Sequence, residues 1–359
     1  MLRRVIGALL LIAAIMGPAI HLDAAARKSS PRHSGTAAQA LSFHNPLEMG
    51  ADPCLFWYKG WYYLSTTKAV DVSLRRARRL GELRTARDQV VWQDPMTARF
   101  HDVWAAEFHL LDTGDRPRWF LYYTSDNGKN DASHRIYVAQ SAGTDPMGPY
   151  TFVAQLQTDP EDQFYAIDPT VLKLPDGSLY LFWCGRPSPA GQGLYVSRMK
   201  NPWTLTGTRT YLPASGFGCP SVREGPELLQ HSGKLFLVYS MCGASTPDYR
   251  LGMLYADVKS DLLNPASWKQ YPRIVFARVD QYGVYGPGHC YFFKSPDRTQ
   301  DWIAYHAKSG SADTYADRST RAQRFTWSPD GIPDFGLPLP LDRTLAPPSG
   351  EPPLPAAAQ

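Results

Sequence analysis

Five polar side chains recur along this 359-residue chain, each of them 9 to 13 residues before a short aromatic segment. They are Asp52, Glu107, Asp168, Glu224 and His289. Carboxylates and imidazoles transfer protons in enzymes because burial and neighbouring charges can move their pKa values toward neutral pH. If the fold gathers these groups, the like charges raise one another's pKa, and such a cluster is costly unless the protein uses it. The first hypothesis is therefore a site for acid–base chemistry.

Three of these carboxylates match the needs of glycoside hydrolysis. That reaction requires one carboxylic acid to protonate the leaving oxygen and a second carboxylate as base or nucleophile. A third carboxylate nearby keeps the acid protonated by repulsion of like charges. Asp52, Asp168 and Glu224 come from three separate segments and fit these roles.

The aromatic segments that must position these residues repeat along the chain. They begin at Trp61, Trp119, Leu179, Leu235 and Trp302, so successive starts lie 58, 60, 56 and 67 residues apart. A period of this size marks a repeat architecture, and strands this short indicate propeller blades of four strands each. The innermost strands of a propeller surround one axis, so one polar residue per blade would converge on one axial pocket. We therefore expect an all-β, five-bladed β-propeller in a single domain.

Composition agrees with a sheet protein that binds sugars. Aromatic residues make up 13% of the chain, which favours strands over helices and suits a carbohydrate site. The net charge is +4, and the basic cluster Arg75–Arg79 contains no aromatic residue. We expect that cluster to be an exposed loop and expect no binding to nucleic acid.

The chain ends differ in composition from the repeats. Residues 1–26 combine basic residues, a short apolar stretch and small residues at the end, which predicts a cleaved signal peptide. The protein is then expected to be secreted, extracellular or periplasmic, and free of the membrane after cleavage. Residues 27–40 read as a disordered leader, 41–340 as the propeller and 341–359 as a Pro-rich tail. We expect a monomer.

The five cysteines give little guidance. They are Cys54, Cys184, Cys219, Cys242 and Cys290. Their number is odd and their spacing matches no zinc motif. In a chain of this size, buried free thiols are favoured over a disulfide framework. The sequence assigns no pair.

The motifs around the three carboxylates resemble those of glycoside hydrolase family 43. Gly50–Pro53, followed by Gly60–Leu64, is similar to the family's base motif. Ile167–Val171 resembles its second acidic motif, and Arg223–Leu228 resembles its acid motif. The resemblance covers about residues 42–340.

This resemblance implies a five-bladed propeller that hydrolyses arabinose- or xylose-containing polysaccharides with inversion. Asp52 would be the general base, Glu224 the general acid, and Asp168 would raise the pKa of the acid and orient it. The carboxyl groups of an inverting pair stand roughly 6.5–9.5 Å apart, which leaves room for the attacking water. Glu227 has the opposite strand parity from Glu224, so we expect only Glu224 to face the axis.

Two further motifs suggest binding residues. Trp104–Glu107 is similar to the family's Trp-Ala-Pro-Glu segment, which implies that Trp104 and Glu107 contact substrate. His289 resembles the family's axial histidine, which implies a substrate contact and a calcium ion held through water. No cofactor is expected for the chemistry itself. Arg318 and Arg321 are additional candidates for substrate contact.

The finer activity rests on overall likeness. Tyr285–His289 and Asp301–Ala307 are most similar to exo-acting α-L-arabinofuranosidases, which implies removal of terminal arabinose from arabinan or arabinoxylan. β-Xylosidase and endo-arabinanase of the same family remain open alternatives. A retaining fructan hydrolase is disfavoured because Ile167 and Gly225 depart from its Arg-Asp-Pro and Glu-Cys motifs. A non-catalytic sugar-binding propeller predicts loss of a carboxylate, and all three are present.

Overall fold

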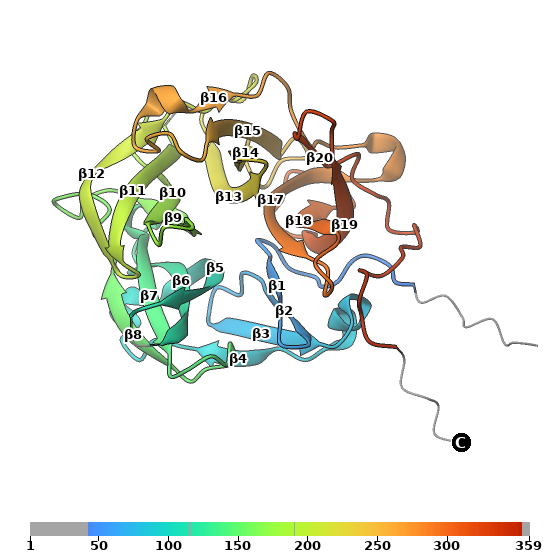
Figure 1. Cartoon of the computed structure of the whole chain (residues 1–359), viewed down its shortest axis with the longest axis horizontal. Helices are drawn as coiled ribbons and strands as arrows, with labels where there is room; N and C mark the ends of the chain where they lie inside the picture. Colours follow the sequence, from blue (N-terminus) through green and yellow to red (C-terminus); the bar gives the residue numbers. More distant parts are fainter. Residues whose placement is uncertain (1–41, 115, 190, 354–359) are drawn as a thin grey trace, which may run out of the picture. The chain divides into compact units, whose positions relative to one another are not determined.

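The computed structural model describes residues 42–114, 116–189 and 191–353. The expected signal peptide and leader lie outside these residues. Five sheets stand around a central axis (Figure 1), each made of four antiparallel strands. The prediction of an all-β, five-bladed propeller is confirmed. Within the described ranges, no helix has the length and apolar character needed to cross a membrane.

The blades follow one another along the chain. Blade 1 contains β1 (Cys54–Tyr58), β2 (Trp61–Ser65), β3 (Val72–Ala77) and β4 (Gln89–Trp92), and blade 2 contains β5 (His101–Asp112), β6 (Pro117–Asp126), β7 (Arg135–Ser141) and β8 (Tyr150–Gln155). Blade 3 contains β9 (Ala166–Lys173), β10 (Leu179–Gly185), β11 (Gly193–Asn201) and β12 (Thr204–Leu212). Blade 4 contains β13 (Arg223–His231), β14 (Lys234–Met241), β15 (Arg250–Asp257) and β16 (Lys269–Gln270), and blade 5 contains β17 (Tyr285–Lys294), β18 (Asp301–Lys308), β19 (Ser319–Trp327) and β20 (Pro333–Asp334).

Short 3-10 helices lie in the connections between these strands. They are η1 (Leu80–Thr85), η2 (Thr97–Arg99), η3 (Asp131–Ser133), η4 (Pro265–Ser267) and η5 (Asp280–Tyr282).

The aromatic segments that revealed the repeat are the second strands of the blades. Alternate side chains of a strand point to opposite faces, so in a radial blade each face meets a neighbouring blade. In β6, Leu121 and Tyr123 pack toward blade 1, whereas Phe120 and Tyr122 pack toward blade 3, and all four are fully buried. The second strands are therefore apolar on both faces, which explains why the sequence shows unbroken aromatic runs.

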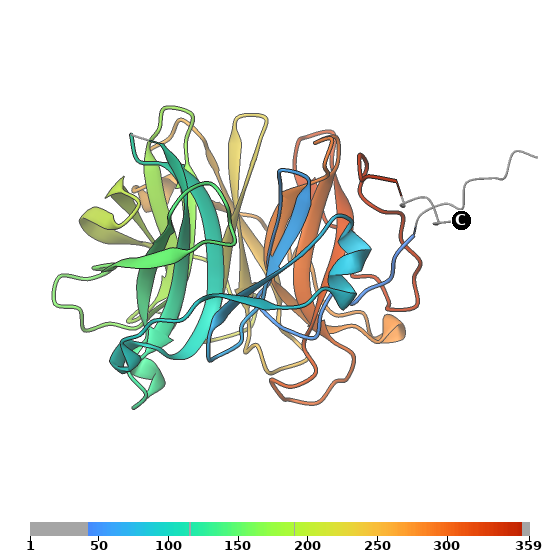
Figure 2. The ribbon, with the colours of Figure 1, turned by 90° about the horizontal axis from the view of Figure 1, so that it is seen from below.

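The ring is closed where the two ends of the described chain meet, between blades 1 and 5 (Figures 1 and 2). The side chain of Asn45 exchanges two hydrogen bonds with the backbone of Ala322 in β19, at 3.0 and 2.9 Å. Phe43 pairs with Leu345, which lies within the Pro-rich C-terminal segment. The Glu351 carboxylate accepts a hydrogen bond from the backbone of Leu80 in η1. These contacts tie the last blade to the first.

A disulfide joins Cys219 to Cys242 across blade 4, a pair that the sequence did not assign. Cys54, Cys184 and Cys290 are buried free thiols.

Candidate active site

The innermost strand of each blade leaves regular strand geometry at one residue near the axis. This residue has a left-handed backbone, with φ from 45° to 57°. The five residues, which we call the first layer, are Asp52, Ala105, Asp168, Gly225 and His289. In β5, β9, β13 and β17 the pairing with the second strand shifts register at or next to this point. A bulge of this kind re-aims side chains that would otherwise alternate between blade faces.

A second layer follows two residues further along each inner strand, or roughly 6–7 Å. Its members are Cys54, Glu107, Thr170, Glu227 and Tyr291. The position in blade 2 that corresponds to Asp52 is thus Ala105, and Glu107 belongs to the second layer.

The expectation that Glu227 turns away from the axis is wrong. The Glu227 carboxylate accepts a hydrogen bond from Thr170 of blade 3 at 3.1 Å and also contacts Glu107 of blade 2. The strand-parity argument fails because the register between β13 and β14 shifts between Glu224 and Glu227. One bulge therefore lets both residues approach the axis.

Asp52 is surrounded by polar side chains at the start of blade 1. Its Oδ2 accepts a hydrogen bond from Thr67 at 2.8 Å, and its Oδ1 lies 3.2 Å from Nδ1 of both His289 and His306. Nη1 of Arg318 is 3.5 Å from the same oxygen. Burial would raise the pKa of Asp52, but His289, Arg318 and His306 together hold it well below its usual value. Burial also lowers the pKa of both imidazoles, so Arg318 is the neighbour that stays charged at neutral pH.

Glu224 has the opposite tendency. Burial, together with the charge of Asp52, raises its pKa to about 7, although hydrogen bonds from Tyr249 and Gln192 oppose the rise. The Tyr249 hydroxyl lies 2.8 Å from Oε1, and Gln192 Nε2 lies 2.7 Å from Oε2. A carboxyl group with this pKa can carry a proton at neutral pH and release it.

Asp168 interacts electrostatically with both of the other carboxylates. Its Oδ2 accepts a hydrogen bond from the backbone N–H of Gly225 at 2.9 Å, which joins blade 3 to the residue after Glu224. Burial and then the charges of Glu224 and Asp52 raise its pKa well above the usual value. The structure therefore brings Asp52, Asp168 and Glu224 into one electrostatic group.

Trp104 and His289 also border this group. The Trp104 ring stacks on His134 with centroids 3.8 Å apart and packs beside Tyr165 and Ile167, at the start of blade 3. The His289 backbone N–H donates to Ser240 at 2.8 Å, and its ring faces Asp52.

Glu107 lies away from these residues, in the second layer, where its carboxylate is 2.8 Å from Nε2 of His109. Burial raises the pKa of Glu107 to about 8 and that of Glu227 well above its usual value. Burial alone lowers the pKa of His109 to about 4, so this ring is neutral at neutral pH.

Sequence reasoning missed several residues that contact the carboxylates of Asp52 and Glu224. Thr67, Gln192 and Tyr249 carry no motif that marks them. His306 falls within the Asp301–Ala307 stretch, but only its distance to Asp52 shows its place. Only one of the two arginine candidates for substrate contact lies in the site. Arg318 reaches Asp52. Arg321 is fully buried and bonds to Ser309 and Ser319 within blade 5.

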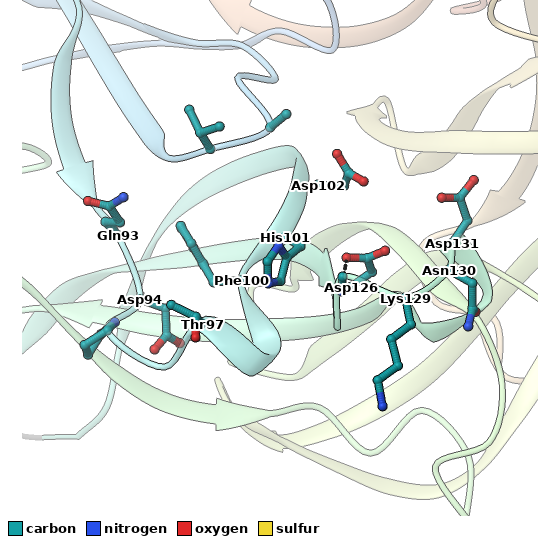
Figure 3. A pocket seen from close by; sticks show the side chains of 14 residues that line it. Gln93, Asp94, Thr97, Phe100, His101, Asp102, Asp126, Lys129, Asn130 and Asp131 are labelled. Atoms are coloured by element: carbon teal, nitrogen blue, oxygen red, sulfur yellow. Dashed lines mark hydrogen bonds between the residues drawn. The ribbon is translucent and has the colours of Figure 1, made fainter.

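A rim cavity of about 920 Å³ lies next to this site, between blades 1 and 2 (Figure 3). Its lining includes Asp102, Asp126 and Asp131. Asp126, Asp131 and His134 have ligand atoms within 4.8 Å of one another. Both ring nitrogens of His134, however, face main-chain oxygens at 2.9 and 3.0 Å. That histidine orients the Trp104 ring and is not free to bind a metal.

Comparison with known proteins agrees with this geometry. Residues 43–333 match the family model described as Glycosyl hydrolases family 43. A curated extracellular exo-α-(1→5)-L-arabinofuranosidase from Streptomyces avermitilis is 34% identical, over 86% of this chain and 66% of the relative. α-L-Arabinofuranosidase 43 from Humicola insolens is 31% identical, over 85% of this chain and 65% of its own. The chain thus spans about two thirds of the length of these relatives.

Solved structures share the fold. The crystal structure of α-L-arabinofuranosidase from Lactobacillus brevis superposes with a TM-score of 0.76 at 30% identity, covering 84% of this chain and 98% of the other. A thermostable family-43 glycoside hydrolase superposes with a TM-score of 0.71 at 22% identity, covering 85% of this chain and 99% of the other.

Proposed function

This chain belongs to glycosyl hydrolase family 43, and on that premise we propose that it is a secreted, inverting, exo-acting α-L-arabinofuranosidase. Its substrates would be arabinan or arabinoxylan, from which it removes terminal arabinose. Relatives named as arabinofuranosidases, two of them extracellular, support this choice of sugar and location.

The observation that carries the proposal is the opposite pKa tendency of two neighbouring carboxyl groups. The pKa of Asp52 is held well below its usual value, whereas that of Glu224 rises to about 7. A pair of carboxyl groups whose environments separate their pKa values supplies a base and an acid at the same pH. A sugar-binding propeller has no need of that difference.

In the proposed mechanism, Asp52 accepts a proton from a water molecule as the water attacks the anomeric carbon. Glu224 donates its proton to the glycosidic oxygen as the bond to the anomeric carbon breaks. The charge of Asp52 adds to burial in keeping Glu224 protonated before the reaction, and we assign Asp168 to orienting the acid through its hydrogen bond to the Gly225 backbone. Trp104 and His289 border this pocket, where we assign them to substrate binding; Glu107 is too deep for a first contact and is assigned to the floor of the pocket.

A release assay separates this activity from its nearest alternatives. Aryl α-L-arabinofuranoside, aryl β-xyloside and linear arabinan should be compared at equal enzyme concentration. We expect arabinose from the first substrate and from the ends of the third. Xylose release would instead identify a β-xylosidase, and a rapid fall in polymer length would identify an endo-arabinanase.

We also propose a calcium ion beside His289, held through water. The Asp52 carboxylate lies 3.2 Å from the His289 ring, and calcium prefers negatively charged oxygen ligands. Because Nδ1 of His289 faces Asp52, its other ring nitrogen is the one that would bind an ordered water. The ion would stabilise the fold and reduce carboxylate repulsion. Chelation should lower the melting temperature, and calcium should restore it; an unchanged melting temperature with no co-purifying metal would refute the ion.

A further inference from the structure

We propose that Gln192 and Tyr249 are positioning residues for the acid, Glu224. Gln192 keeps Oε2 of Glu224 as a hydrogen-bond acceptor, so the transferable proton resides on Oε1, beside Tyr249. This inference rests on the proposed function, since it specifies how the proposed acid is prepared. Gln192 comes from blade 3 and Tyr249 from blade 4, so Glu224 is held from two sides.

The orientation of the Gln192 amide is fixed by a third residue. Nη2 of Arg186 lies 3.0 Å from Oε1 of Gln192, and a guanidinium group can only donate hydrogen bonds. The amide oxygen must therefore face Arg186, which leaves the NH₂ group to face Oε2 of Glu224 at 2.7 Å. An amide NH₂ cannot accept a proton, so Oε2 is the acceptor in this contact. Gln192 is only 6% exposed, and Arg186 is itself held over the Tyr165 ring at 4.5 Å.

Tyr249 can serve both protonation states of Glu224. A hydroxyl group donates one hydrogen bond and accepts others. With Glu224 ionised, the Tyr249 hydroxyl donates to Oε1 across 2.8 Å. With Glu224 protonated, the same hydroxyl can accept from Oε1 and turn its own hydrogen to Ser240, which it also contacts. The Tyr249 ring stacks on the His306 ring, with centroids 5.4 Å apart and an interplanar angle of 1°. This stacking fixes the position of the Tyr249 hydroxyl.

The proton balance follows from this arrangement. The O–H bond on Oε1 breaks as a new O–H bond forms on the glycosidic oxygen, which keeps the electron pair of its broken bond to carbon. Water forms the new bond to carbon and gives its proton to Asp52. Tyr249 and Gln192 then both donate to the Glu224 carboxylate until solvent returns a proton to it. Tyr249 and Gln192 both favour the ionised form of Glu224. Burial raises the pKa of the Tyr249 hydroxyl well above its usual value, so the phenol itself stays neutral.

Other groups also act on Glu224 and must be separated from these two. Asp52 adds to the burial that raises its pKa, and Arg318 lowers it. Asp168 of blade 3 interacts with its charge, as do the neutral side chains of Tyr165 and Cys184. Removal of Asp52 should therefore lower the pKa of Glu224, whereas removal of Gln192 or Tyr249 should raise it. The direction of the shift distinguishes the positioning residues from the repelling carboxylate.

The experiment compares Gln192→Met and Tyr249→Phe with the unaltered protein. Tyr239→Phe is the matched control, because Tyr239 is a buried tyrosine of the same blade whose hydroxyl bonds to Ser215. We expect the alkaline limb of kcat/KM on aryl arabinofuranoside to rise by about one to two pH units in Gln192→Met and Tyr249→Phe, since each loses one hydrogen bond to a charged group. The alkaline limb should stay unchanged in Tyr239→Phe.

A carbon-13 titration of glutamate-labelled protein gives the pKa of Glu224 without any activity, with Glu224→Gln to assign its signal. Raised values in Gln192→Met and Tyr249→Phe would support the inference even if arabinofuranosides were not substrates, in which case only the proposed function would fail. Unchanged or lowered values in these folded variants would overturn it. The two variants alter different blades, so if one of them fails to fold, the other still decides the outcome.

Discussion

Two layers of side chains line the same axis of this propeller, and their carboxyl groups differ in character. In the first layer, Asp52 is held ionised near Arg318 while Asp168 and the adjoining Glu224 are pushed toward the protonated form. In the second layer, Glu107 and Glu227 contact each other and Thr170, and both favour the protonated form. The carboxyl groups of both layers are buried, but only those of the first layer have an arginine, Arg318, beside them.

This difference shows what turns a carboxylate cluster into acid–base machinery. Burial alone raises the pKa of every carboxyl group and therefore gives only weak acids. His289, Arg318 and His306 beside one carboxylate of the cluster separate the pKa values, so that a base and an acid coexist at one pH. Arg318 enters from the β18–β19 connection, outside the inner strands that supply the carboxylates. The chemistry thus depends on a loop placed over a repeated scaffold.

The largest effect should come from removing the base in the first layer. Asp52→Asn keeps the size and polarity of the side chain but cannot accept the proton of water. We expect kcat to fall about 10³-fold or more on every substrate, because the base is needed whatever the leaving group. Single-turnover and steady-state assays on aryl arabinofuranoside and arabinan would measure this. A loss below tenfold on both substrates would mean that another group is the base.

Removing the acid should produce a smaller loss that depends on substrate. Glu224→Gln cannot protonate the leaving oxygen, so arabinan turnover should fall by about 10²- to 10³-fold. An aryl arabinofuranoside with a good leaving group needs little protonation and should lose about tenfold or less. The ratio of kcat on the two substrates measures the difference. Equal losses on both substrates would contradict the assignment.

The second layer should affect stability rather than chemistry. In the unfolded chain Glu227 has the ordinary pKa of a glutamate, whereas in the folded protein its pKa is higher. Between the two pKa values the folded state therefore binds more protons than the unfolded state. The free energy of unfolding should therefore decrease as pH rises above the ordinary glutamate pKa, by roughly 1.4 kcal/mol per pH unit for each group, and for Glu107 the decrease should extend to about pH 8.

Glu227→Gln removes one of these groups and should make the decrease shallower. Urea unfolding at pH 5, 6, 7 and 8 would measure the slope. Exposed Glu161→Gln serves as the matched control and should run parallel to the unaltered protein. Parallel curves for Glu227→Gln as well would show that the second-layer carboxyl groups are already ionised in the fold.

The sequence predicted most of the scaffold and the acidic positions on it. The aromatic second strands are buried on both faces, so their period survives in the sequence as a period of large apolar side chains. Three of the five first-layer positions, Asp52, Asp168 and His289, were also found, because Asp and His stand out against that background. The propeller and the grouping of Asp52, Asp168 and Glu224 followed from these two signals.

The features that the sequence could not predict depend on β-bulges and on the paths of loops. Strand parity assigned Glu227 to a blade face, but the register shift after Glu224 lets it reach the axis. Spacing placed Glu107 beside Asp52, whereas Ala105 holds the equivalent position. The partners that tune the carboxylates, such as Gln192 and Arg318, lie on connections whose paths no local pattern encodes. Their roles emerge only from distances in space.

The stereochemistry of the first-formed sugar tests the central claim most directly. If Asp52 activates water and Glu224 protonates the leaving oxygen, one displacement converts an α-linked arabinofuranoside into the β anomer. Proton NMR of a fast reaction at high enzyme concentration should show the β signal first, followed by the α signal as the sugar equilibrates. Appearance of the α anomer first would contradict the account, because retention requires a covalent intermediate on a carboxylate nucleophile.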